Sequence, residues 1–192
     1  MLPRLSDWWN KAPSGYRPGV TLEQARRNLG GLQFEALAPG AGRFATVDGG
    51  LVFELHEKPE SQFLMHLVLT EFVVDGPAVG VEDATLELRH TGALRRQGIA
   101  CKVREGDSTL GERLAERLAQ DEHLQRALLP LDFKRLQLQR ADGRWTIRLE
   151  HMAASEVVNR LPNFRRYLRL SREQRDYLLR ALFHLRRVLG DF

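Results

Sequence analysis

Nine arginines lie between Arg160 and Arg187, in a segment that holds only two acids, Glu173 and Asp176. The segment therefore carries a charge of +7, whereas the whole chain carries +4, so the remainder of the protein is mildly acidic. A basic segment on an acidic body indicates where an anionic partner would bind. Arginine favours bidentate recognition of carboxylate or phosphate. A GC-rich genome also enriches arginine, and composition alone leaves both explanations open.

The middle of this segment interleaves arginines with aromatic residues. Arg165, Arg166 and Arg169 lie beside Phe164 and Tyr167, with no acid nearby in the sequence. Such a pattern is typical of surfaces that meet single-stranded nucleic acid or an anionic peptide. We therefore predict ligand binding by Arg165, Arg166, Arg169 and Tyr167.

The alternative is an ordinary solvated helix face. Arg172, Asp176 and Arg180 follow each other at a spacing of four residues, which allows weak ion pairs on the surface of a helix. The two interpretations predict different environments for the arginines, paired in one case and unpaired in the other.

The histidines suggest one further candidate. His66 lies on a strand face whose neighbours are Leu64 and Val68, so it is either a hydrogen-bonded core residue or a pocket residue. Glu54 and His56 share one side of another strand, but the sequence marks no third metal ligand. The chain contains no GxSxG, P-loop, GxGxxG or CxxC motif. We expect no metal, no cofactor and no catalytic residue.

Composition is that of a soluble globular protein, because 43% of the 192 residues are hydrophobic and 28% are charged. The single cysteine, Cys101, excludes an internal disulfide and fits a reducing compartment. The N-terminus lacks the apolar region of a signal peptide, and the longest apolar stretch, 63–74, is too short to span a bilayer. We expect a cytoplasmic protein without a membrane partner.

Strands are indicated over much of the first 150 residues. Asp48-Gly49-Gly50 and Ala141-Asp142-Gly143 predict two hairpins, spanning 44–57 and 133–150. Further strands are expected at 85–90 and 99–104. The stretch 63–74 is apolar on both faces, which predicts a central strand covered on both sides or a dimer interface.

Helices are predicted from caps and leucine stripes. A capping box at Thr21–Gln24 opens a helix over 22–29, and a long helix runs from Thr109 to Pro130. Ser155 is expected to cap a short helix that ends before Pro162. Ser171 and Gln174 cap the last helix, whose apolar stripe comprises Leu178, Ala181, Leu182, Leu185 and Leu189.

This order of elements predicts an α+β fold, with an antiparallel sheet of about six to eight strands and helices packed mainly on one face. Residues 1–20 form an N-terminal arm in which Trp8 and Trp9 are expected to fold back onto the body. Residues 21–192 form a single domain.

Two resemblances accompany this reading. The segment RYLRLSREQRDYLLRAL, Arg166 to Leu182, resembles that of an uncharacterised proteobacterial family, which implies no activity. The order helix, strands, helix, hairpin, helix is similar to that of type III secretion chaperones, which dimerise and wrap an extended protein segment. That likeness implies a binding role and a homodimer.

The leading hypothesis is a non-enzymatic, adaptor-like or chaperone-like protein that holds a protein segment or a small anionic ligand. The first alternative is nonspecific nucleic-acid binding through the arginine-rich segment. The second is an enzyme or ligand carrier with a pocket near His66.

Overall fold

The computed structural model describes residues 15–192, with the exception of 62–64, 81, 93–95, 107 and 161–162. The predicted N-terminal arm with Trp8 and Trp9 thus lies almost entirely outside the described residues, as does the start of the apolar stretch 63–74.

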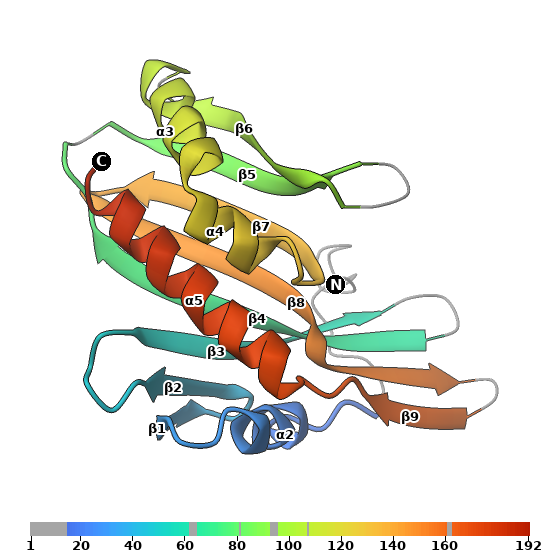
Figure 1. The fold of residues 1–192 in the computed structure, drawn as a ribbon. Coiled ribbons are helices and arrows are strands. Elements are labelled where there is room, and N and C mark those ends of the chain that lie inside the picture. The colour runs from blue at the N-terminus through green and yellow to red at the C-terminus, as the bar shows by residue number, and fades with distance from the viewer. Residues whose placement is uncertain (1–14, 62–64, 81, 93–95, 107, 161–162) are drawn as a thin grey trace, which may run out of the picture.

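The described strands form one antiparallel sheet in the order β1-β2-β3-β4-β8-β7-β5-β6, and β9 pairs with β8 beyond this path (Figure 1). The strands are β1 (Gln33–Ala38), β2 (Ala41–Ala45), β3 (Val52–Ser61), β4 (Met65–Pro77), β5 (Ala84–Thr91), β6 (Gly98–Gly106), β7 (Phe133–Ala141), β8 (Arg144–Arg160) and β9 (Asn163–Tyr167). The predicted antiparallel α+β fold is confirmed. The stretch 63–74 supplies most of β4, which lies centrally between β3 and β8.

The helices of the described chain are α2 (Val20–Asn28), α3 (Ser108–Gln120), α4 (Glu122–Leu128) and α5 (Arg172–Leu189). All of them cover the same face of the sheet, as Figure 1 shows. The apolar stripe of α5 is buried as its spacing predicts, so this long helix lies flat across the middle of the sheet.

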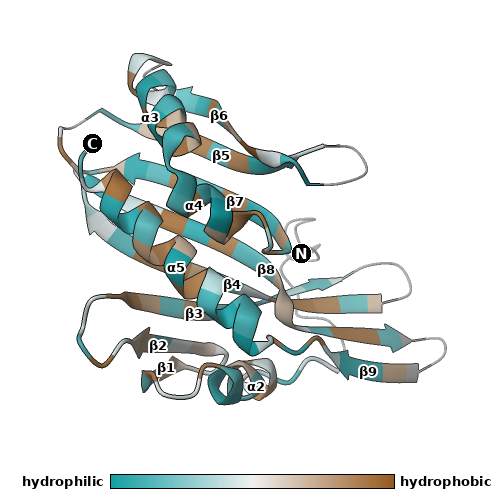
Figure 2. Ribbon diagram, viewed as in Figure 1, coloured by the Kyte–Doolittle hydropathy of each residue, from teal (hydrophilic) through white to brown (hydrophobic). Residues whose placement is uncertain are grey.

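Alternation along the strands separates an apolar face from a polar one. Leu55, Phe72, Leu149, Leu136 and Leu88 lie side by side in register across five strands and form a buried row beneath the helices. Figure 2 shows the resulting alternation of brown and teal along the strands. The opposite face carries ion pairs. The cross-strand pairs there are Arg43–Glu54, Lys58–Glu71, Lys58–Glu150, Arg148–Glu71 and Arg104–Glu87, and Arg89–Glu87 is a pair within β5.

Two helix starts differ from the sequence-based prediction. The carboxylate of Glu57, on β3, accepts hydrogen bonds from the Gly19 and Leu22 amides at 3.0 and 2.7 Å, and it caps α2 in place of the predicted Thr21 capping box. The long helix expected from Thr109 to Pro130 is divided in two, because Asp121 accepts a hydrogen bond from the Leu124 amide and caps α4.

The short helix predicted after Ser155 is wrong, because β8 continues through this region as a strand. Four residues of β8, 152–155, lie opposite the single residue Leu69 of β4 and form a bulge with Ala154 at a φ of 66°. The Ser155 hydroxyl, read from sequence as a helix cap, donates to the His151 carbonyl and accepts from the Thr70 amide. Beyond the bulge, β8 leaves β7 and pairs with β9.

Candidate anion-binding pocket

The end of α2 and the start of α5 meet at one corner of the molecule (Figure 1). The chain reaches this corner from β9, through Leu168, whose amide donates to the Ser155 carbonyl in the β8 bulge at 2.8 Å. The Leu170 amide then donates to the side-chain oxygen of Asn28 on α2 at 2.9 Å, and the Leu170 side chain is buried. The two helices are thereby fixed relative to each other.

The first turn of α5 follows directly and is closed by a capping box. The Gln174 amide donates to the Ser171 hydroxyl at 3.2 Å, and the Ser171 amide donates to the Gln174 side chain at 3.4 Å. The prediction of this cap from sequence is confirmed. The box holds the side chains of Arg172 and Arg175 at the junction with α2.

A pocket of about 490 Å³ lies at this junction. Four arginines contribute to its wall, one from α2, one from the segment between β9 and α5, and two from the first turns of α5. The lining residues are Arg27, Asn28, Gly30, Arg169, Leu170, Ser171, Arg172 and Arg175. We call this cavity the arginine pocket. None of its lining residues in the described part of the chain is acidic, although Glu23 pairs with Arg27 at 3.2 Å from outside it.

Three of these arginines lack an acidic partner. Among the described residues, no carboxylate lies within 4.0 Å of the guanidinium groups of Arg169, Arg172 or Arg175. The ion pairs that the spacing of Arg172, Asp176 and Arg180 allows are not formed within that distance. The Nε atom of Arg175 is buried and has no hydrogen-bond partner. Like charges gathered in a concave wall repel one another, so an anion bound there would relieve the repulsion.

The chemistry of the wall is that of a donor-only site. Guanidinium groups carry five N–H donors each and no acceptor, and they match the oxygen pairs of carboxylate and phosphate. The positive end of the α5 macrodipole adds to the same potential. The arrangement suits an acceptor-rich group with at least one negative charge, held by hydrogen bonds and charge.

The comparisons with known proteins concern nearly the whole chain. Residues 27–189 match the model of a family described as "Protein of unknown function (DUF3156)". The chain belongs to this family. The matched residues begin at Arg27 and include every other lining residue of the arginine pocket. No curated protein and no solved structure matches the chain. The resemblance to an uncharacterised family is therefore confirmed, and the family itself specifies no ligand.

The residues proposed as ligands from this family member's sequence do not form one surface. Arg165 is paired in register with Val158 and Arg166 with Val157, so their side chains leave opposite faces of the β8–β9 ribbon. Arg165 forms an ion pair with Glu156 at 3.3 Å and donates to the Gly15 carbonyl at 2.7 Å. Only Arg169 of the three lines the arginine pocket.

Tyr167 and His66 are both on the helix-covered side of the sheet. The Tyr167 hydroxyl is buried without a hydrogen-bond partner, burial raises its pKa, and the charge of nearby Arg169 opposes that shift. Tyr167 and His66 are both absent from the described lining of the arginine pocket. His66 is 1% exposed.

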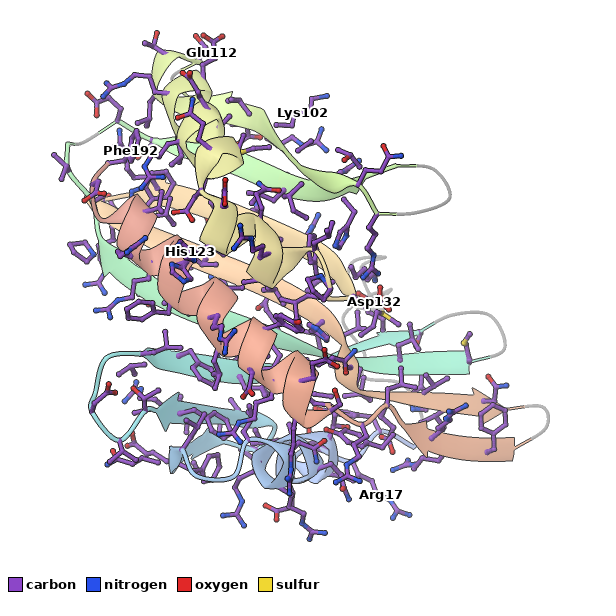
Figure 3. All side chains as sticks on the ribbon, viewed as in Figure 1. Arg17, Lys102, Glu112, His123, Asp132 and Phe192 are labelled. Carbon is purple, nitrogen blue, oxygen red and sulfur yellow. The ribbon has the colours of Figure 1, made fainter. Side chains whose placement is uncertain are left out.

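The described cysteine and a pair of stacked histidines are further reactive groups. Burial raises the pKa of the Cys101 thiol to about 11, which suppresses the nucleophilic thiolate. His123 of α4, labelled in Figure 3, stacks on His184 of α5 with ring centroids 5.6 Å apart. Within the described part of the chain no group of three or more His, Cys, Asp or Glu residues is arranged to hold a metal ion. Nor does any helix there have the length and apolar character needed to cross a membrane.

The structure adds residues that sequence reasoning missed. Arg27, Asn28 and Gly30 line the arginine pocket from α2, and the Asn28–Leu170 contact joins positions 142 residues apart. No local signal in the sequence links α2 with the arginine-rich segment.

Proposed function

We propose that this protein is a non-enzymatic binding protein that holds an anionic group, phosphate or carboxylate, in the arginine pocket. The observation that carries the proposal is the contrast between two sets of arginines. On the polar face of the sheet, Arg43, Arg89, Arg104 and Arg148 each pair with a glutamate. In the pocket, Arg169, Arg172 and Arg175 converge on one cavity without an acid within reach.

The backbone that carries the pocket arginines is anchored. Asn28 fixes the segment that carries Arg169, and the capping box fixes the turn that carries Arg172. Little loop ordering is then needed on binding, which favours affinity. A bidentate guanidinium contact would distinguish phosphate or carboxylate from a halide of equal charge.

The test is thermal unfolding with sodium phosphate, sodium citrate or sodium chloride at equal ionic strength. With a dissociation constant of about 1 mM, a ligand at about 10 mM stabilises the native state by about 1.4 kcal/mol, which raises the melting temperature by roughly 3–6 °C. Chloride should give no comparable shift. The triple variant Arg169→Gln, Arg172→Gln and Arg175→Gln should lose the shift.

A matched control removes the same charge elsewhere. The variant Arg126→Gln, Arg144→Gln and Arg166→Gln replaces three exposed arginines outside the pocket and should keep the shift. If both triple variants lost the shift in melting temperature equally, the stabilisation by phosphate would depend on net charge alone, and the proposal would be wrong. Calorimetric titration of the wild type supplies the stoichiometry, which should be one anion per chain.

A further inference from the structure

One stripe of α5 joins the arginine pocket to a second cavity. Arg175, Leu179 and Phe183 are spaced by four residues, so their side chains follow one another along the same flank of the helix. Arg175 lines the arginine pocket, whereas Leu179 and Phe183 line a cavity of about 220 Å³. The flank therefore runs from a cationic hollow to a second hollow further along the helix.

The second cavity lies between α5 and the β2–β3 turn. The turn contributes Thr46, Asp48, Gly50 and Leu51, and the Gly50 carbonyl is held by Arg186 of α5 at 3.0 Å. Leu51 is buried, while the Phe183 side chain is 44% exposed, an unusual degree for an aromatic residue on a helix that packs on a core. A volume of about 220 Å³ suffices for one leucine-sized side chain.

Phe183 also borders a third hollow of about 330 Å³, on its other side, together with Pro77, Arg186 and Arg187. An aromatic ring that stands between two hollows and is ringed by polar groups has the form of a binding anchor. The two hollows hold Arg180, Arg186 and Arg187 but also the acids Asp48 and Asp191. Phe183 therefore supplies an apolar contact, and the unpaired arginines of the arginine pocket supply the charge that favours an acidic partner.

The separation of the two sites sets the length of a ligand that reaches both. Phe183 follows Arg175 by eight positions, which is about 12 Å along a helix axis at roughly 1.5 Å per residue. An extended chain covers this distance in about four residues at roughly 3.3 Å each. A short peptide segment is long enough, whereas an isolated phosphate or carboxylate reaches only one site.

We propose that this flank of α5 binds an extended acidic protein segment, with its anionic side chain in the arginine pocket and an apolar side chain about four residues away against Phe183. The inference rests on the proposed anion-binding function and names its ligand as a peptide. The anionic group is a phosphorylated serine or an aspartate, and the arms of the test separate these two.

The probe is a fluorescein-labelled seven-residue peptide of glycine and serine, with phosphoserine at its second position and leucine at its sixth. One companion peptide has glycine in place of leucine, and another has aspartate in place of phosphoserine. Fluorescence anisotropy measures their affinities for the full chain. Burying most of one leucine side chain should make the leucine peptide bind about tenfold more tightly than the glycine companion.

Protein variants assign this gain to Phe183. Phe183→Ala should reduce the tenfold ratio to about one while leaving the affinity for the glycine companion unchanged. Leu37→Ala, which shortens an exposed side chain on β1, is the matched control and should keep the ratio. The triple pocket variant Arg169→Gln, Arg172→Gln and Arg175→Gln should lose both peptides. The relative affinities of the phosphoserine and aspartate peptides identify the anion.

Failure of the two proposals has different signatures. If the glycine companion does not bind, the arginine pocket does not hold an anion and both proposals fail. If it binds but leucine adds nothing, or if Phe183→Ala keeps the ratio, only the peptide inference is overturned. Sedimentation velocity adds one contrary outcome: a dimer that Phe183→Ala dissociates, with no leucine effect, would assign this flank to self-association.

Discussion

Acidification should destabilise this protein through His151. The side chain lies on β8 immediately before the bulge, is 0% exposed, and has its Nδ1 atom 3.2 Å from the Ala153 carbonyl. Burial lowers the pKa of this imidazole from 6.5 to about 4, and the hydrogen bond to the carbonyl only partly opposes the shift. The native protein therefore holds His151 neutral over a range in which the unfolded chain protonates it.

The sign and size follow from proton linkage. Between pH 6.5 and pH 4 the unfolded state binds the extra proton, so stability falls as the pH is lowered through this window and changes no further below it on account of His151. At about 1.4 kcal/mol per pKa unit, the loss amounts to roughly 3 kcal/mol. That is a large part of the stability of an ordinary domain.

Urea unfolding at several pH values between 7.5 and 4 measures this loss directly. His151→Gln removes the titrating group while keeping an amide donor, so its stability should depend on pH by roughly 3 kcal/mol less than that of the wild type. Burial also lowers the pKa of His90 and His184, so part of the slope should survive in His151→Gln. An unchanged slope in His151→Gln would refute the reasoning.

Three other positions give independent tests. Glu57→Ala removes the acceptor of three hydrogen bonds, from Tyr16, Gly19 and Leu22, and should lower the free energy of unfolding by about 2–4 kcal/mol; a loss under about 0.5 kcal/mol in urea would contradict its role as the α2 cap. Ser155→Ala should cost about 1–3 kcal/mol, because the buried Thr70 amide loses its acceptor, and wild-type stability would exclude that role. The Cys101 thiol should react with iodoacetamide at pH 8 about a hundredfold more slowly in the native than in the unfolded protein, and equal rates would contradict its burial.

Local signals predicted the elements that local contacts determine. The Asp48-Gly49-Gly50 and Asp142-Gly143 turns each connect neighbouring strands, and the Ser171–Gln174 box begins α5 where expected. In each case the residues that decide the structure are a few positions apart, so the sequence contains the whole interaction. The apolar residues on both faces of 63–74 likewise predicted the central place of β4, which lies between β3 and β8.

The sequence-based predictions were wrong where residues distant in the sequence determine the local structure. Serine is a common helix cap, but the Ser155 hydroxyl accepts a hydrogen bond from the Thr70 amide and donates one to the His151 carbonyl inside the sheet. The cap of α2 comes from Glu57, 35 residues beyond Leu22. Arg165 and Arg166 looked like one cluster because β9 was not predicted, and a strand sends adjacent side chains to opposite faces. Sequence-spacing rules cannot predict these contacts, because they join residues that are far apart in the sequence or lie on a strand that was not predicted.

The β8 bulge connects the fold with the proposed site. β7 begins at Phe133, opposite His151, and β8 continues past the bulge along β4 and pairs there with β9. The Ala154 amide in the bulge donates to the Leu168 carbonyl at 2.6 Å. From there the chain passes Arg169 and enters α5 beside α2. The position of the arginine pocket is therefore a consequence of sheet topology, and a variant that removes the bulge should lose anion binding without a change at any pocket residue.

The same geometry divides the arginines of the +7 segment into those with partners in the fold and those without. Arg165 is satisfied by Glu156, Arg186 donates to the Gly50 carbonyl, and Arg187 lies 3.7 Å from Asp121. These arginines add positive charge to the surface but already have partners in the fold. Arg169, Arg172 and Arg175 do not, and they share one cavity. An anion that merely responded to charge would bind along the whole segment, whereas one that needs unpaired, converging guanidinium groups would bind only at the junction of α2 and α5.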